Sequence, residues 1–120
     1  MAIAKKKRRR IVVGSREFWW WIHEDWENPA KPGAPTLTVA TDDRRIRLYY
    51  VLDQPEQLRH ITAAGPEFRG LTQGGRHRRF RCPGFGLPDE VRPSDVAELI
   101  TWCTEPGPLP ARTDWRGESE

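Results

Sequence analysis

The chain has 120 residues, of which 37% are hydrophobic, and its 20 basic and 17 acidic residues give a formal net charge of +3. This length suits one domain with one core, and the small positive excess does not by itself indicate a nucleic-acid partner. No apolar segment follows the basic start of the chain, so we expect neither a signal peptide nor a membrane span. Cys82 and Cys103 lie far apart and outside CxxC spacing, which favours two reduced thiols and a cytoplasmic protein.

Charge alternates in blocks along the chain. Residues 1–23 carry seven Lys or Arg and one acid, and residues 44–81 carry nine Arg and three acids, whereas residues 24–43 and 82–120 are acidic. The basic run Arg76–Arg81 is most simply a solvated face, although it can extend a phosphate-binding footprint. Opposite-sign blocks can also steer a partner of complementary charge.

A β-hairpin is the first element that the sequence predicts. Its strands cover Arg8–Val13 and Arg16–His23. The connecting pair Gly14-Ser15 suits a type II′ turn, because glycine tolerates a positive φ at the first central position. A two-residue turn of this kind fixes the register of the whole hairpin.

The register decides which side chains share a face. It places Arg10 opposite Trp19 and Arg8 opposite Trp21, and side chains alternate between the two faces along each strand. The core face is expected to hold Ile11, Val13, Phe18, Trp20 and Ile22. The other face is expected to hold Arg8, Arg10, Val12, Trp19 and Trp21.

A second hairpin follows a proline-rich segment. Residues 24–35 are expected to form a linker without regular structure. Strands over Thr36–Thr41 and Arg44–Leu52 then flank Asp42-Asp43, a weak turn pair that allows a wider loop. One face is expected to hold Leu37, Val39, Ile46, Leu48, Tyr50 and Leu52. The other is expected to hold Thr36, Thr38, Arg45, Arg47 and Tyr49.

Two short strands, Gln57–Thr62 and Arg78–Cys82, are predicted in the middle of the chain, separated by a glycine-rich loop over 63–75. A helix over 93–104 follows, with proline at its first position and one apolar stripe at helical spacing. The stripe comprises Val96, Leu99, Ile100 and Cys103. Residues 105–120 are expected to form an extended tail along the surface.

These elements predict an α+β domain over residues 1–104. It contains an antiparallel sheet of about four to six strands, two N-terminal hairpins included, with one C-terminal helix packed on one face. The predicted core is Ile11, Val13, Phe18, Trp20, Ile22, Leu37, Val39, Ile46, Leu48, Tyr50, Leu52, Val96, Leu99, Ile100 and Cys103.

The sheet face opposite the helix is the candidate site. If both hairpins share one sheet, this face gathers Arg8, Arg10, Trp19, Trp21, Arg45, Arg47 and Tyr49. Arginine can contact phosphates and flat aromatic rings can stack on bases, as binding of single-stranded nucleic acid requires. The same residue types are enriched at the centres of protein interfaces. We expect a binding module that engages an unidentified protein partner through this face, with single-stranded RNA or DNA as the alternative ligand.

A purely structural role is the competing interpretation of the same residues. Arg8 above Trp21 and Arg10 above Trp19 can form cross-strand cation–π pairs, worth about 0.5–1 kcal/mol each at exposed sites. Residues 24–35 or the tail can also cover the tryptophans. In either case the face would stabilise the fold and bind nothing.

Catalysis has little support in the sequence. His23, His60 and His77 are isolated, and none has the spacing of metal ligands. Cys82 lies near two arginines, which can lower the pKa of a thiol, but no base is placed beside it. We expect no enzyme activity, no cofactor, no bound metal and no membrane partner.

Overall fold

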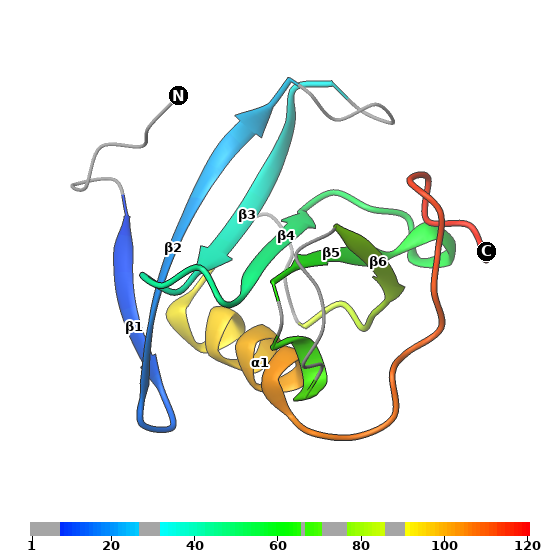
Figure 1. Cartoon of the computed structure of the whole chain (residues 1–120). Coiled ribbons are helices and arrows are strands. Elements are labelled where there is room, and N and C mark those ends of the chain that lie inside the picture. Colours follow the sequence, from blue (N-terminus) through cyan, green and yellow to red (C-terminus); the bar gives the residue numbers. More distant parts are fainter. Residues whose placement is uncertain (1–7, 27–31, 66, 71–76, 86–90) are drawn as a thin grey trace.

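The computed structural model describes residues 8–26, 32–65, 67–70, 77–85 and 91–120. Within them, six strands form one sheet in the order β1-β2-β3-β4-β5-β6, in which every neighbouring pair is antiparallel. The strands are β1 (Arg9–Val13), β2 (Arg16–Asp25), β3 (Ala34–Ala40), β4 (Arg47–Val51), β5 (His60–Ala64) and β6 (Arg78–Arg81). One helix, α1 (Pro93–Thr104), packs against the sheet (Figure 1). The predicted α+β class, strand number and single C-terminal helix are confirmed.

The first hairpin folds as its turn predicts. Gly14 has a φ of 66°, whereas Ser15 does not have a positive φ, as a type II′ turn requires. Arg10 pairs with Trp19 and Ile11 with Phe18, which is the predicted register. The two-residue turn at Gly14-Ser15 therefore sets which residues of β1 and β2 lie opposite each other.

The predicted linker over 24–35 is wrong at both of its ends. β2 continues to Asp25 and β3 starts at Ala34, so the two strands pair beyond the predicted boundaries. Proline tolerates this because its fixed φ is compatible with an extended strand and only its N–H is missing. The carbonyl of Pro35 still accepts a hydrogen bond from the Leu52 N–H, at 3.0 Å.

The loop of the second hairpin spans residues 41–46, wider than an Asp42-Asp43 turn. Pairing between β3 and β4 ends at Ala40 opposite Arg47. The predicted core face is buried from Leu37 to Tyr50. Arg45, however, stands in the loop rather than on a strand, so the alternation that predicted its direction does not apply to it.

The middle of the chain differs from the prediction. Glu56–Leu58 forms a short 3-10 turn, η2, and β5 begins only at His60. The Gln54 side chain explains this boundary, because its amide oxygen accepts from the His60 N–H and its amide nitrogen donates to the His60 carbonyl, both at 3.0 Å. The strand predicted over Arg78–Cys82 is confirmed as β6, which ends one residue earlier.

The core lies between the sheet and α1. The predicted helix stripe Val96, Leu99, Ile100 and Cys103 is fully buried. It packs with a phenylalanine cluster that the sequence prediction missed, which includes a stacked pair, Phe68 on the 3-10 turn η3 (Phe68–Gly70) and Phe80 on β6, with ring centroids 4.7 Å apart. Ile22 is a wrong core prediction, because 45% of it is exposed.

The tail extends the sheet beyond β6. The Arg81 N–H donates to the Ala111 carbonyl at 2.8 Å, and the Thr113 N–H donates to the Arg79 carbonyl at 3.0 Å. In Figure 1 this segment runs from the end of α1 back to the β6 edge. No helix in the described part of the chain is long and apolar enough to cross a membrane.

Candidate binding grooves on the outer sheet face

The sheet face away from α1, here called the outer face, has a floor of small residues between bulky ones. One cross-strand row runs from Trp21 through Thr38, Tyr49 and Thr62 to Arg79. Thr38 is only 3% exposed although it faces away from the core. Along this row, short side chains on β3 and β5 alternate with longer ones on β2, β4 and β6, which makes the face hollow rather than flat.

The first hollow, here called the Arg/Trp groove, has a volume of about 690 Å³. Its lining combines arginine, tryptophan and tyrosine with an acidic rim: Arg8, Trp19, Trp21, His23, Glu24, Asp25, Trp26, Thr38, Ala40, Thr41, Asp42, Arg44, Arg47 and Tyr49. Five of the seven predicted site residues line it, namely Arg8, Trp19, Trp21, Arg47 and Tyr49. The structure therefore brings most of the predicted site together.

Arg10 and Arg45 do not line this groove. Arg10 forms an ion pair with Glu17 on the same hairpin. Arg45 Nε donates to Glu67 at 3.0 Å, and Arg16 makes a bidentate contact with the same carboxylate at 2.7 and 3.1 Å. The hydrogen bond from Arg16 is the main reason that the pKa of Glu67 is lowered, so its charge stays available to both arginines.

The register predicted one cation–π contact for Arg8 and one for Arg10, but in the structure Arg8 makes both. Its guanidinium carbon lies 5.5 Å from the Trp19 ring centroid and 6.0 Å from that of Trp21. The predicted stack of Arg10 on Trp19 is replaced by the pair with Glu17. One arginine between two indoles is a partly structural arrangement, worth about 0.5–1 kcal/mol per contact at exposed sites.

Three N–H donors of the Arg/Trp groove lack a partner. Nε of Arg8, Nε of Arg47 and Nε1 of Trp19 are buried, and no acceptor among the described residues bonds to them. A buried donor without a partner costs about 1–3 kcal/mol, so three in one groove are expensive for a purely structural surface.

Trp26 is a site residue that the sequence prediction missed. It is 70% exposed, the largest value among the large hydrophobic residues described. Its ring lies against Gly33, where a Cβ would come within 2.8 Å of the indole. Because residues 24–35 were expected to be an irregular linker, no face was assigned to Trp26.

The second hollow, here called the His groove, has a volume of about 460 Å³ and continues from the first. It is lined by His23, Asp25, Thr36, Tyr49, Val51, His60, Thr62, His77, Arg79 and Trp115. Three of these residues, His23, Asp25 and Tyr49, also line the Arg/Trp groove. All three histidines of the chain, isolated in the sequence, thus share one hollow.

The histidines are held differently. His23 Nε2 and Thr38 Oγ1 share a hydrogen bond of 2.9 Å. His60 Nδ1 bonds to the Leu58 carbonyl at 2.8 Å, which requires the proton on Nδ1. His77 is exposed, and its ring lies 5.6 Å from that of Tyr49.

Neither cysteine chemistry nor a metal set stands out in the described part of the chain. Burial raises the pKa of Cys82 to about 12, which outweighs the nearby Arg59 and Arg81. Cys82 is therefore a thiol at neutral pH and a poor nucleophile. Among the described residues, no three His, Cys, Asp or Glu side chains come together as metal ligands.

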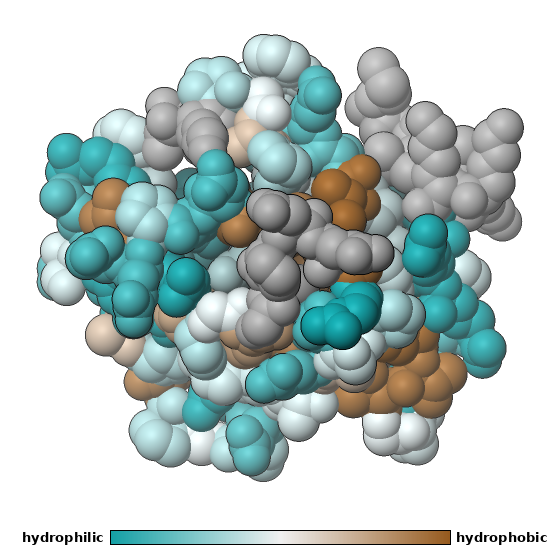
Figure 2. Space-filling model, turned by 180° about the vertical axis from the view of Figure 1, so that it is seen from behind, coloured by the Kyte–Doolittle hydropathy of each residue, from teal (hydrophilic) through white to brown (hydrophobic). Residues whose placement is uncertain are grey.

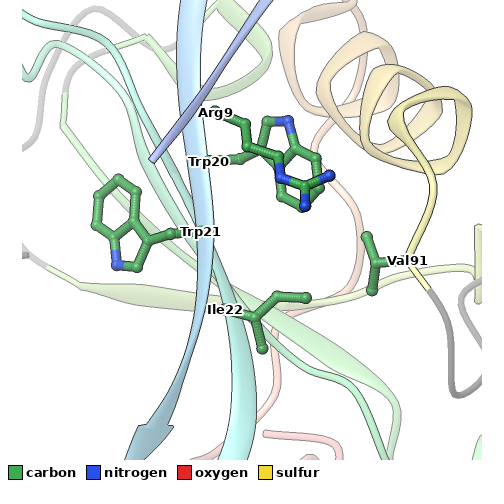
Figure 3. A pocket seen from close by; sticks show the side chains of 5 residues that line it. All are labelled: Arg9, Trp20, Trp21, Ile22 and Val91. Atoms are coloured by element: carbon green, nitrogen blue, oxygen red, sulfur yellow. The ribbon is translucent and has the colours of Figure 1, made fainter. Parts of the chain in front are cut away.

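Apolar surface outside the grooves is scattered. Ile22 borders a hollow of about 200 Å³ with Arg9, Trp20 and Val91, while Trp21 points to the opposite side of β2 (Figure 3). Seen from behind, brown apolar areas are separated by hydrophilic ones (Figure 2). Isolated apolar residues of this kind are common on soluble domains and do not mark a second site.

No protein-family model matches this chain, and neither a curated protein nor a solved structure matches it.

Proposed function

We propose that this chain is a binding module whose Arg/Trp groove takes single-stranded nucleic acid. The sequence suggested a protein partner first and nucleic acid second. Three features of the groove support the second: its hollow shape, its arginines and its aromatic walls. A single strand is narrow enough to lie along a groove and presents both phosphates and unstacked bases.

The arginines of the groove carry the proposal, because Arg8 and Arg47 both line it and both are partly exposed. A phosphodiester offers several acceptor oxygens, and arginine binds them with charge-assisted hydrogen bonds. Neither Arg8 nor Arg47 forms an ion pair with a described residue, so no carboxylate of the described residues competes for them. The groove thus places two guanidinium charges where a nucleic-acid backbone would supply acceptors.

The aromatic residues supply the second half of the chemistry. Trp26 is mostly exposed, and Trp21 and Tyr49 line the same groove as Arg8 and Arg47. Stacking on aromatic rings contributes about 1–3 kcal/mol per base and does not depend strongly on sequence. We therefore propose binding without strong base preference.

Four arginine variants test the groove with matched charge changes. We expect Arg8→Ala and Arg47→Ala each to weaken binding of a labelled oligodeoxythymidine by about tenfold, the value of one charge-assisted contact. Arg10→Ala and Arg45→Ala remove the same charge outside the groove and should change affinity little. Fluorescence anisotropy over a salt series should also show the slope of log affinity falling by about 0.7 for each lost phosphate contact.

The salt series separates this proposal from a protein partner. If the folded protein binds no oligonucleotide at low salt, nucleic acid is eliminated and the protein partner becomes the remaining ligand class. If all four arginine variants weaken binding equally, binding is a property of net charge and the groove is not the site.

Trp26→Ala tests stacking separately. Loss of one stacking platform should weaken oligodeoxythymidine binding by about 5- to 150-fold, with little change in the salt slope because no phosphate contact is removed. Ile22→Ala, at an exposed apolar position on the helix side of β2, is the control and should bind like the parent protein. Unchanged affinity in Trp26→Ala would show that the Trp26 ring does not stack on bases and only packs against Gly33.

A cytoplasmic location is part of the proposal. Cys82 and Cys103 are both buried and both free. Free thiols are typical of reducing compartments, which supports the location without specifying it further.

A further inference from the structure

Two of the three histidines of the His groove, His60 and His77, flank one arginine, Arg79. Thr62 on β5 pairs with Arg79 on β6, and His60 pairs with Arg81. His77 directly precedes β6, two residues before Arg79. With a rise of about 3.4 Å per residue, His60 and His77 stand about 7 Å along the sheet to opposite sides of Arg79.

Arg79 is suited to hold a phosphate between the two imidazoles. It lines the groove and forms no ion pair with a described residue. Tyr49 and Trp115 line the same hollow and offer ring faces for the flanking bases. In-line displacement at phosphorus places the attacking and leaving oxygens on opposite sides, which is where the two histidines lie.

His60 has the form of a general base. Its Nδ1–H donates to the Leu58 carbonyl, so its Nε2 carries the free lone pair. Burial lowers the pKa of His60; the Leu58 carbonyl opposes this shift, Arg79 and Arg81 add to it, and Asp114 opposes it. The imidazole is therefore neutral at pH 7 and able to accept a proton.

His77 has the form of a general acid. It is exposed and lies beside the ring of Tyr49 rather than under other residues. Contact with solvent lets a general acid regain its proton after each turnover. The two histidines thus differ in environment, as an acid and a base in one site must.

We propose that the His groove cleaves single-stranded RNA, an inference that rests on the nucleic-acid binding proposed above. His60 Nε2 takes the proton of a ribose 2′-hydroxyl while that oxygen forms a bond to the adjacent phosphorus. The bond from phosphorus to the 5′-oxygen breaks, His77 gives that oxygen a proton, and Arg79 neutralises the phosphate oxygens. The products are a 2′,3′-cyclic phosphate and a free 5′-hydroxyl, so no other reactant is consumed.

A chimeric oligonucleotide tests this step. It contains deoxythymidines with one ribonucleotide in the middle, so that only one bond has a neighbouring 2′-hydroxyl, and the all-deoxy strand is the matched control. We expect cleavage of the chimera alone, with the cyclic phosphate identified by mass spectrometry. The rate should show a bell-shaped dependence on pH, because one histidine must be neutral and the other protonated.

Two histidine variants assign the chemistry. His60→Gln, which removes the imidazole base, and His77→Ala should each lower the cleavage rate by about 100-fold or more. Affinity for the all-deoxy strand is measured in both variants, so that a slower cleavage step is separated from weaker binding. Arg10→Ala, prepared identically, should cleave at the parental rate because Arg10 lies outside both grooves.

Each outcome is decisive. An intact chimera that nevertheless binds would overturn cleavage and leave the binding proposal standing, whereas failure of both strands to bind would remove both. Cleavage that persists in His60→Gln and His77→Ala would place the activity outside the His groove, and cleavage of the all-deoxy strand would exclude attack by the 2′-hydroxyl.

Discussion

Phe80→Ala is expected to lower the free energy of unfolding by about 3–5 kcal/mol. Phe80 is fully buried, stacks on Phe68 at 4.7 Å and pairs across the sheet with Ile61. The cavity would open where β6, the turn η3 and the core under α1 meet, and backbone hydrogen bonds from β6 to β5 and to the tail limit how far the site can collapse. Such a loss is a large part of the roughly 5–15 kcal/mol that holds a domain folded.

Thermal and urea unfolding followed by circular dichroism would measure this loss, with an expected fall in Tm of roughly 10–20 °C. Val12→Ala is the matched control, because Val12 is also an apolar strand residue but is 51% exposed. Its effect should stay within about 0.5 kcal/mol. If the two variants unfolded alike, Phe80 could not belong to the core described above.

Strand alternation and turn chemistry were sufficient to predict the faces of the two hairpins. Gly14 fixed a two-residue turn, and from it the pairing of Arg10 with Trp19 followed residue by residue. The buried face from Leu37 to Tyr50 was equally accessible, since its apolar residues keep a period of two. Local rules succeed here because adjacent strands are joined by short connections.

The same rules failed where the direction of a side chain depends on loop length, or its burial on the element that packs above it. The six-residue loop over 41–46 turned Arg45 toward Glu67, and no turn motif in the sequence indicated that width. Ile22 was assigned to the correct side of β2, but a hollow separates it from Val91 and leaves it exposed (Figure 3). Burial depends on what packs above a strand, which alternation does not report.

The His groove could not be predicted because it depends on strand order. His60 was readable as an outer-face residue from its alternation with buried Ile61. That His23 on β2 and His77 beside β6 reach the same hollow requires knowing that the sheet runs in sequence order with β3 and β4 between them. A meander topology is common, but nothing in the spacing of these histidines specifies it.

Gly117→Ala is expected to release the tail from the sheet. Gly117 has a φ of 90°, and an added Cβ would lie 1.9 Å from the Leu58 carbonyl oxygen and 2.6 Å from His60 Nδ1. The turn around Gly117 is closed by the Asp114 carboxylate, which accepts from the N–H groups of Arg116 and Glu118 at 2.9 and 3.0 Å. A rigid turn cannot absorb such an overlap, so it must move away from β5 as a unit.

Hydrogen exchange at the Arg81 and Thr113 amides reports this release, because both donate across the junction between β6 and the tail. If the overlap costs about 3 kcal/mol, these amides should exchange about 100-fold faster in the variant. Gly14→Ala carries a similar φ penalty at 66°, but its added Cβ meets nothing within 4 Å, so it separates backbone strain from overlap.

The Gly117→Ala variant also tests whether the tail supports the proposed RNA cleavage. The overlap would fall on the two atoms of the hydrogen bond between His60 and Leu58, and release would withdraw Trp115 from the wall of the His groove. Gly117→Ala should therefore lose RNA cleavage while the Arg/Trp groove, which contains neither His60 nor Trp115, still binds an all-deoxy strand. If cleavage survives although the Arg81 and Thr113 amides exchange rapidly, His60 keeps its tautomer without the tail. The hydrogen bond to the Leu58 carbonyl would then be sufficient to orient the His60 imidazole as a base.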